Sequence, residues 1–365
     1  MKCGIIGLPN VGKTMLFNAI TKAGAMSASY QFSTIEPNES VVSVPDARVD
    51  GLARMFRPKK TTYATVSFVD IAGLVSGASK GEGLGNKFLS HIREVDALVH
   101  VVRCFKDENV LHVYDHLDPA DDARTVELEL ILADLETVIK RGEKARKMLK
   151  VGDKRLQLEL ETAEKLRLHL EEEKPARTCV LSDAEKEIAK GWFMLTDKPV
   201  LYAANISESD IGKDENSVPL IKEIKDLAAS QGAETLVISA KIEAELARME
   251  DDERAEFMAE LGLTELGLPR FAHSAYRLLG LISFLTAGPD ECRAWTIKNG
   301  TKAPKAAGKI HSDIERGFIR AEVVPYDTLS REGGMTQCRD KGLVRSEGKE
   351  YVMKDGDVTL FRFNV

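Results

Sequence analysis

The amino-acid sequence predicts an α/β fold that is interrupted by a helical insertion and followed by a small β-rich domain. Three observations lead to this expectation. A strand-like apolar run near the start of the chain ends in a glycine-rich turn and a helix-like segment. Residues 123–173 are rich in Leu, Glu, Lys and Arg and contain no proline, as long helices require. From residue 280 onward, short apolar runs alternate with Gly and Pro turns.

The composition is that of a water-soluble mixed protein, since 43% of the 365 residues are hydrophobic and 30% are charged. The first residues lack a signal-peptide pattern and no run has the length of a membrane helix, so we expect a cytoplasmic monomer without a membrane partner. Five scattered cysteines without a CxxC pair predict reduced thiols and argue against disulfides or a zinc site. A net charge of −7 argues against a protein that coats nucleic acid, but allows local basic surfaces.

The strongest motif is Gly7-Leu-Pro-Asn-Val-Gly12-Lys13-Thr14, which matches GxxxxGK followed by Ser or Thr at every fixed position. It lies between a strand-like and a helix-like segment, which is the context of a phosphate-binding P-loop and which a chance glycine turn does not explain. Backbone N–H groups and the helix start would bind phosphate oxygens. We expect Lys13 to neutralise the β- and γ-phosphates and the Thr14 hydroxyl to bind Mg²⁺. Further nucleotide contacts are expected from Asn10, Val11, Gly12 and Met15.

A second strand-like run, residues 64–70, ends in Asp70-Ile-Ala-Gly73, which resembles the DxxG element of the GTPase superfamily. We expect Asp70 to hold Mg²⁺ through water and the Gly73 N–H to contact the γ-phosphate, at the start of a glycine-rich switch. In the segment that precedes this strand, Thr34 is the expected second Mg²⁺-binding hydroxyl, with Ser33 as the alternative.

The residue after Gly73 bears on how water is positioned. Many small GTPases have a glutamine there that orients the attacking water, whereas this chain has Leu74, which cannot bond water. Slow unassisted hydrolysis is therefore expected. Related GTPases with an apolar residue at this position use an asparagine of the P-loop to help coordinate K⁺, so Asn10 suggests K⁺ as a further cofactor.

The segment Asn205-Ile-Ser-Glu208 follows a strand-like run, where GTPases carry the pattern NKxD. The aspartate of that pattern accepts hydrogen bonds from two guanine donors that adenine lacks. Because Glu208 is longer and Ile206 is uncharged, the sequence predicts a preference for adenine, with the Asn205 amide free to bond the purine edge. Ser239 begins a segment that resembles the SAK element, which closes the base pocket. Phe105 is a candidate to stack on the base, with a core aromatic as an equal alternative.

The chain resembles the YchF/Obg-like ATPase family within the TRAFAC class of GTPases, because it contains the motifs GLPNVGKT, DIAGL and NISE in this order. The resemblance covers nearly the whole chain. The resemblance implies a P-loop ATPase with Lys13, Thr34 and Gly73 as catalytic residues, relaxed use of GTP, and association with the ribosome and ribosomal RNA in translation or stress response. A departure is Thr14 in place of the commoner serine. A GTPase of the same fold and a non-catalytic ribosome-binding scaffold are the alternatives.

Two leucine-rich runs predict a helical hairpin with a turn at Val151-Gly-Asp153. The apolar residues at helical spacing are Leu128, Ile131, Leu132, Leu135, Val138 and Ile139 in the first run and Leu156, Leu160, Ala163, Leu166 and Leu170 in the second. Ser182 and Glu185 predict a capping box at the start of another helix. Residues 140–155 hold eight basic and two acidic residues near the expected tip, a balance of +6. These charges suit contact with RNA phosphates, although a solvated charged face explains them equally well.

The sequence thus predicts three domains. Residues 1–122 and 199–278 form a nucleotide-binding domain of the OBG-type G class, residues 123–198 an inserted helical coiled coil, and residues 279–365 a domain that resembles the β-grasp TGS domain. Between residues 298 and 320, six basic residues against two acidic ones are compatible with RNA contact. His112 and His116 are four residues apart and share a helix face if that segment is helical, but no third ligand accompanies them, so no histidine metal site is expected.

Overall fold

The computed structural model describes residues 1–27, 38–71, 84–107, 109–114, 116–150 and 153–364. The chain forms two compact units, which consist of Met1–Ser40 with Ser67–Phe271 and of Val41–Val66 with Ala272–Val365. Residues 41–66 thus group with the C-terminal residues, whereas the sequence analysis had assigned them to the nucleotide-binding domain. The reason is that β3 (Lys60–Thr62) pairs in parallel with β9 (Glu291–Lys298).

The first sheet has the strand order β2-β4-β1-β5-β6-β7. The pairings of β1 with β4 and β5, of β5 with β6 and of β6 with β7 are all parallel. Every residue of β5 and β6 is buried, which explains the continuous apolar runs that are typical of parallel strands covered on both faces. The strands comprise β1 (Lys2–Ile6), β2 (Glu39–Val44), β4 (Ala64–Asp70), β5 (Ala97–Cys104), β6 (Val200–Ile206) and β7 (Glu234–Ile238).

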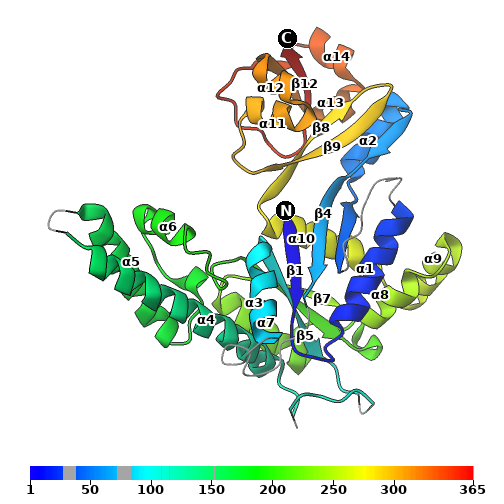
Figure 1. The fold of residues 1–365 in the computed structure, drawn as a ribbon. Coiled ribbons are helices and arrows are strands. Elements are labelled where there is room, and N and C mark those ends of the chain that lie inside the picture. The colour runs from blue at the N-terminus through cyan, green and yellow to red at the C-terminus, as the bar shows by residue number, and fades with distance from the viewer. Residues whose placement is uncertain (28–37, 72–83, 108, 115, 151–152, 365) are drawn as a thin grey trace. The chain divides into compact units, whose positions relative to one another are not determined.

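Helices cover both faces of the first sheet (Figure 1). One face carries α1 (Lys13–Ser27) and α8 (Ala240–Leu246), and the other carries α3 (Leu84–Glu94) and α7 (Pro219–Ser230). Two more helices, α9 (Asp251–Glu260) and α10 (Gly267–Leu278), follow α8 along the chain. Because β1 lies between β4 and β5, its carboxyl end is the topological switch point of the sheet, where open α/β folds bind ligands.

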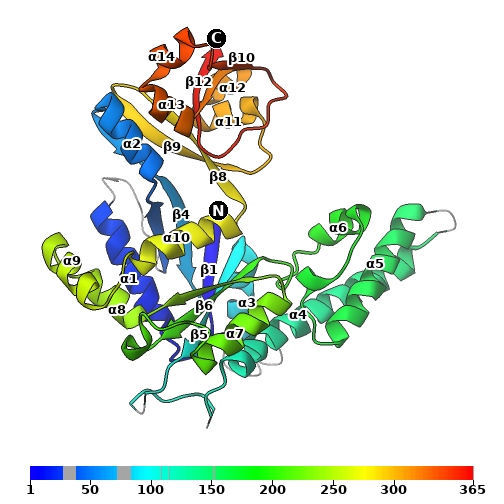
Figure 2. The ribbon, with the colours of Figure 1, turned by 180° about the vertical axis from the view of Figure 1, so that it is seen from behind.

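The helical insertion is an antiparallel hairpin of α4 (Pro119–Met148) and α5 (Lys154–Glu171), which lie side by side (Figure 2). The predicted hairpin is therefore confirmed, while its turn residues 151–152 lie outside the described residues. The 3₁₀ turn η1 (Ala176–Thr178) and α6 (Asp183–Lys190) follow, and α6 begins with the expected capping box of Ser182 and Glu185. Apolar residues of these elements form one cluster, which includes Ile131, Val138, Ala163, Leu166, Leu170 and Trp192.

Asp134 ties this insertion to the sheet. Its carboxylate lies in the middle of α4, is 1% exposed, and accepts hydrogen bonds from the Leu195 N–H at 2.8 Å, the Thr196 N–H at 2.7 Å and the Thr196 hydroxyl at 2.7 Å. Residues 195–196 lead directly into β6. A buried carboxylate with three donors therefore fixes where α4 lies relative to the strand that ends at the candidate site.

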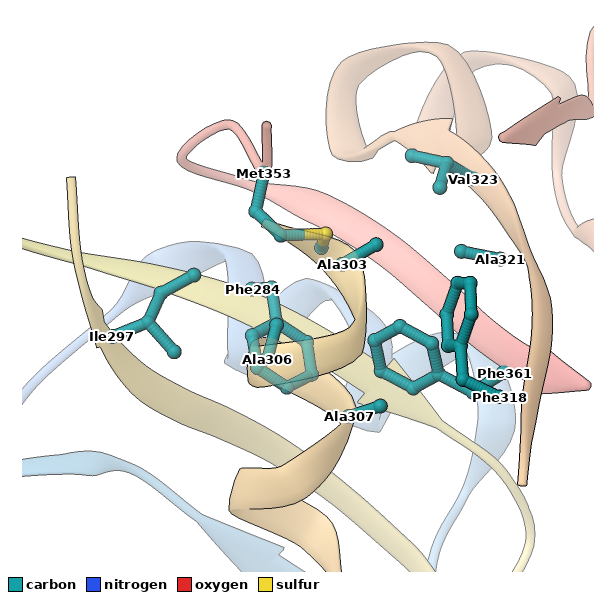
Figure 3. Packing of buried hydrophobic residues seen from close by; sticks show 10 residues of the cluster. All are labelled: Phe284, Ile297, Ala303, Ala306, Ala307, Phe318, Ala321, Val323, Met353 and Phe361. Atoms are coloured by element: carbon teal, nitrogen blue, oxygen red, sulfur yellow. The ribbon is translucent and has the colours of Figure 1, made fainter. Parts of the chain in front are cut away.

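The second unit is built on a sheet of strand order β11-β10-β12-β8-β9-β3. β8 and β9 form an antiparallel hairpin, and β12 lies parallel to β8. The alanines Ala303, Ala306 and Ala307 of α11 face the rings of Phe284, Phe318 and Phe361 (Figure 3), so that small side chains let the helix lie close to the sheet. The remaining elements are β8 (Leu281–Ala287), β10 (Phe318–Pro325), β11 (Arg345–Glu347), β12 (Asp357–Phe363), α2 (Ala47–Phe56), α11 (Ala303–Ile310), α12 (Ser312–Arg316), α13 (Tyr326–Glu332) and α14 (Met335–Asp340).

Among the helices that the structure describes, none combines the length and the apolar composition that crossing a bilayer requires.

We expect Asp134→Ala to lower the free energy of unfolding by about 2–4 kcal/mol, because three buried donors lose their acceptor. Urea unfolding followed by circular dichroism measures this change. Asp226→Ala is the matched control, since that carboxylate is 65% exposed and pairs with Lys222 on the surface of α7, and its loss is expected to cost less than about 1 kcal/mol. Equal destabilisation by the two variants would contradict the anchoring role of Asp134.

Candidate functional site

The loop between β1 and α1 has the backbone shape that a phosphate cradle needs (Figure 1). Gly7, Asn10 and Gly12 have positive φ angles of 148°, 62° and 96°. A Cβ atom on Gly7 would lie 2.3 Å from the carbonyl oxygen of Val101 in β5, so only glycine allows the loop to lie this close to the neighbouring strand. The turn then enters α1 at Lys13, which places the helix start beside the loop.

The side chain of Asn205 holds this loop in place. Its Nδ2 donates to the carbonyl oxygen of Val11 at 2.8 Å, and its Oδ1 accepts from the N–H of Ala240 at 2.9 Å. A Cβ atom on Gly12 would lie 2.3 Å from Asn205 Nδ2, so the glycine is required by this contact as well. These two bonds join the P-loop to the start of α8 and leave the second Nδ2 hydrogen unused, so the expected bond of Asn205 to the purine edge stays a prediction.

Lys13 is buried at the base of the loop, with 7% of the residue exposed. Its Nζ donates to the carbonyl oxygen of Leu8 at 2.6 Å. Burial lowers the pKa of Lys13 from 10.5 to about 8, and the Asp70 carboxylate opposes part of this shift. The ammonium group thus lies in a position where an additional anion would relieve the cost of its burial.

Asp70 ends β4 opposite the start of α1. The Thr14 hydroxyl donates to Asp70 Oδ2 at 3.4 Å, and burial raises the pKa of Asp70, opposed by the charge of Lys13. Asp70 Oδ1 is buried and has no hydrogen-bond partner among the described residues. A buried acceptor without a partner is costly, so this oxygen is available to a cation or to a water molecule bound to one.

A cavity of about 670 Å³ opens beside the loop, and it contains most of the residues that the sequence suggested for the base. Ile206 lies at the end of β6 and Met15 in the first turn of α1. Phe105 also lines the cavity and is partly exposed, which excludes the alternative of a core aromatic. The lining residues are Asn10, Gly12, Met15, Phe105, Lys106, Asp107, Val110, Asn205, Ile206, Ser207, Glu208, Ser209 and Lys241.

Glu208 is already paired across this cavity. Its Oε2 lies 3.0 Å from Nζ of Lys241, in the first turn of α8, and both side chains are about half exposed. The sequence predicts Ser239 as the pocket residue of the segment that also contains Lys241. Ser239 is 5% exposed, does not line the cavity, and has a hydroxyl without a partner among the described residues. Lys241, rather than Ser239, contributes the side chain that reaches Glu208.

Several expected residues do not contribute to the described geometry. Thr34 and Ser33, as well as Gly73 and Leu74, lie outside the described residues. The segment of His112 and His116 is not helical, so the two rings do not share a helix face. His112 Nε2 instead lies 2.8 Å from Asp122 Oδ2 in α4. In the described part of the chain, no group of three or more His, Cys, Asp or Glu side chains has a metal-binding arrangement.

The loop, the buried lysine and the adjacent carboxylate together form a site for a polyphosphate, and the cavity beside them has room for a base. Comparisons with known proteins agree with this geometry. A family model described as "50S ribosome-binding GTPase" matches residues 2–130, and the model YchF-GTPase_C, described as "Protein of unknown function", matches residues 281–364. The "Ribosome-binding ATPase YchF" of Bacillus subtilis is 52% identical over 365 residues, which cover 100% of both chains.

The chain belongs to the YchF family. A protein of the same name from Haemophilus influenzae is 48% identical over 364 residues, which cover 100% of this chain and 99% of that one. The solved structure of the Schizosaccharomyces pombe YchF GTPase is 38% identical and has a TM-score of 0.89, covering 99% of this chain and 97% of that one. These matches confirm the predicted α/β fold class with a P-loop G domain, and they assign residues 281–364 to a YchF C-terminal domain, for which the sequence predicts a TGS-like fold.

The lowered pKa of Lys13 gives a testable pH dependence in the nucleotide-free protein. Between pH 8 and 10.5 the unfolded chain binds a proton at Lys13 that the folded chain has lost, so stability rises with pH in this window and is lowest below it. The pKa difference corresponds to about 3 kcal/mol. We expect the free energy of unfolding of the wild type to gain about this amount relative to Lys13→Met between pH 7 and pH 11. If the free energies of unfolding of the wild type and Lys13→Met change with pH in parallel, the prediction is wrong. It is also wrong if the wild type gains as much stability relative to Lys186→Met, the control at an exposed lysine.

Proposed function

We propose that the chain is a Mg²⁺-dependent ATPase that associates with the ribosome in the cytoplasm and changes its contacts with the nucleotide state. The curated relatives that match it end to end carry the name "Ribosome-binding ATPase YchF". The observation on which the proposal depends is the buried ammonium group of Lys13, which follows a loop with three positive φ angles at the switch point of the sheet.

Lys13 and the loop would stabilise the transferring phosphoryl group. In ATP hydrolysis, water attacks the γ-phosphorus, the bond to the β–γ bridging oxygen breaks, and negative charge moves to the leaving ADP. An ammonium group held at the base of the loop and the N–H groups of the loop's non-proline residues would stabilise that charge without rearranging at the moment of reaction. Of the other proposed catalytic residues, Thr34 and Gly73 belong to this mechanism by resemblance alone.

The residues present suit a magnesium ion. Mg²⁺ binds few protein oxygens and fills its other positions with water and phosphate, so it does not need a cluster of carboxylates. The Thr14 hydroxyl and the partnerless Oδ1 of Asp70 are the groups that would hold it, with Thr34 as a further hydroxyl. A bound Mg²⁺ would neutralise charge on the β- and γ-phosphates. K⁺ near Asn10 is proposed as a second cation.

The base cavity supports adenine over guanine. Guanine recognition of the NKxD type needs a carboxylate free to accept two N–H bonds, whereas the carboxylate of Glu208 is already paired with Lys241. Ile206, 7% exposed, adds an apolar surface at the point where NKxD proteins have a lysine. Asn205 bonds the P-loop and keeps one Nδ2 hydrogen for the purine edge, while base selection is assigned to Glu208, Ile206, Phe105 and backbone groups. GTP use at lower affinity is part of the proposal.

The ribosome contact is proposed to include the basic residues at the end of the helical hairpin. Lys144, Arg146, Lys147 and Lys150 are all exposed around the end of α4, and none of them forms an ion pair within the described part of the chain. Exposed cations of this kind displace counterions from RNA phosphates. We also propose three domains, with residues 41–66 moved from the nucleotide-binding domain to the C-terminal one, a TGS-like role for residues 279–365 in RNA contact, and a monomeric state.

Nucleotide titration and hydrolysis assays test the enzymatic part. The purified protein is expected to bind ATP more tightly than GTP in the presence of Mg²⁺ and to hydrolyse ATP slowly. Lys13→Ala is expected to lower the hydrolysis rate by about 10²- to 10³-fold, because the ammonium group that stabilises the transferring phosphoryl group is lost. Lys186→Ala, which removes an exposed lysine of α6, serves as the control.

Much tighter binding of GTP would make the chain a GTPase, the activity by which the Schizosaccharomyces pombe relative is named. If Lys13→Ala hydrolysed ATP at the wild-type rate, the proposed site would be wrong. The same assay in KCl and in NaCl tests the second cation, and equal rates in the two salts would discard K⁺.

Co-sedimentation with ribosomes tests the partner. Replacing Lys144, Lys147 and Lys150 by Ala is expected to weaken binding and to reduce the slope of log K against log salt by about 2–3, as expected for three lost phosphate contacts. The matched control replaces Lys186, Lys190 and Lys222, which are exposed on α6 and α7. An equal effect of both triple variants would assign the change to net charge. Equal binding under ATP, ADP and a non-hydrolysable analogue would exclude a nucleotide switch.

A further inference from the structure

Arg103 is a buried cation of β5 that bonds main-chain carbonyl groups. The residue is 4% exposed. Its Nε donates to the carbonyl oxygen of Phe105 at 3.1 Å, Nη1 to that of Val110 at 2.9 Å and Nη2 to that of Asp107 at 3.0 Å. Within the described residues, no carboxylate pairs with this guanidinium group. A buried charge with only neutral acceptors is unfavourable unless those bonds are well formed, so a structural role in this loop is indicated.

The three carbonyl groups belong to the loop that forms one wall of the base cavity. Phe105, Lys106, Asp107 and Val110 all line it. A planar guanidinium group holds its N–H donors in a fixed arrangement. Here these donors bond the carbonyl oxygens of Phe105, Asp107 and Val110 at the same time. One side chain thus fixes the backbone at three residues of this wall. A lysine at this position has a single nitrogen and cannot reach the three oxygens in the same geometry.

The same guanidinium group also contacts the ring of Phe105. Arg103 Cζ lies 4.8 Å from the ring centroid, within the range of a cation–π contact. This contact fixes the ring that lines the cavity as well as the backbone that carries it. On the next strand, Asn205 pairs in register with Arg103, and its amide holds the P-loop side of the cavity. The two polar residues at the ends of β5 and β6 therefore order two different walls of the same cavity.

We propose that Arg103 is a positioning residue for the nucleotide base, which pre-forms the wall that includes Phe105, Asp107 and Val110. It acts through Phe105 and the loop backbone, because its own donors are directed to carbonyl groups. A loop that is already ordered does not have to be ordered on binding, so the nucleotide binds more tightly. This inference rests on the proposed function. It adds to it the claim that affinity for the base depends on a buried residue that the sequence motifs do not include.

Binding of two ligands separates this role from a general effect on the fold. The probes are a non-hydrolysable ATP analogue and inorganic triphosphate, both with Mg²⁺, and isothermal titration calorimetry measures their affinities. Arg103→Lys is expected to lower the affinity for the ATP analogue tenfold or more and to change the affinity for triphosphate less than twofold. Arg254→Lys is the matched control, since Arg254 also donates to carbonyl groups, those of Leu246 and Met249, but lies away from the loop.

Each outcome decides the proposal. Unchanged affinity of Arg103→Lys for the ATP analogue would overturn it, and so would an equal loss for both ligands, which would indicate damage to the whole site. The proposal would also be overturned if Arg254→Lys lowered the affinity for the ATP analogue as much as Arg103→Lys does. Failure of the wild-type protein to bind either ligand would instead refute the proposed function itself.

Hydrogen exchange in the wild-type protein provides a measurement that does not depend on the folding of a variant. The N–H groups of Asn109 and Val110 bond to Asp107 within the loop. If Arg103 pre-forms the wall, these two amides are expected to be protected before any nucleotide is added. Exchange at the rate of an unstructured peptide, with protection only after the ATP analogue binds, would overturn the proposal.

Discussion

The candidate site depends on the amide of Asn205, which bonds at once to the carbonyl oxygen of Val11 and to the N–H of Ala240. This pair of bonds joins the loop after β1 to the helix after β7, two segments that are far apart in the sequence. The contact is so close that Gly12 has no room for a side chain. The phosphate loop therefore keeps its curved shape without a ligand, and Lys13 stays buried beneath it at a lowered pKa.

Polar residues at the carboxyl ends of the parallel strands order the site from three sides. Asp70 at the end of β4 keeps one oxygen without a partner, Arg103 near the end of β5 holds a loop, and Asn205 near the end of β6 holds the P-loop. β5 and β6 are buried at every residue, and β4 is buried at alternate residues. Because the sheet is parallel, these polar residues meet at one edge, where a charged and partly apolar ligand such as a nucleotide is expected to bind.

The fold and the phosphate half of the site could be predicted from the sequence because each depends on local patterns. The P-loop is a contiguous motif, the hairpin follows from helical periodicity, and the start of α6 follows from the capping box at Ser182. The base half could not be predicted as well, since it depends on contacts between distant residues. The motif at Asn205 predicts a base ligand, but a linear motif does not show that the same amide also bonds Val11 and Ala240. Arg103 gave only a weak signal, a single charge at the end of an apolar strand, and the pairing of β3 with β9 has no local signal at all.

A crystal structure with a non-hydrolysable ATP analogue and Mg²⁺ tests this account most directly. It is expected to show Lys13 Nζ moved from the Leu8 carbonyl oxygen to phosphate oxygens and the adenine ring in the cavity beside Phe105 and Ile206. The bonds of Asn205 to Val11 and Ala240 are expected to persist unchanged. An Asn205 amide that leaves Val11 to bond the base, or a base bound outside the cavity, would contradict the account.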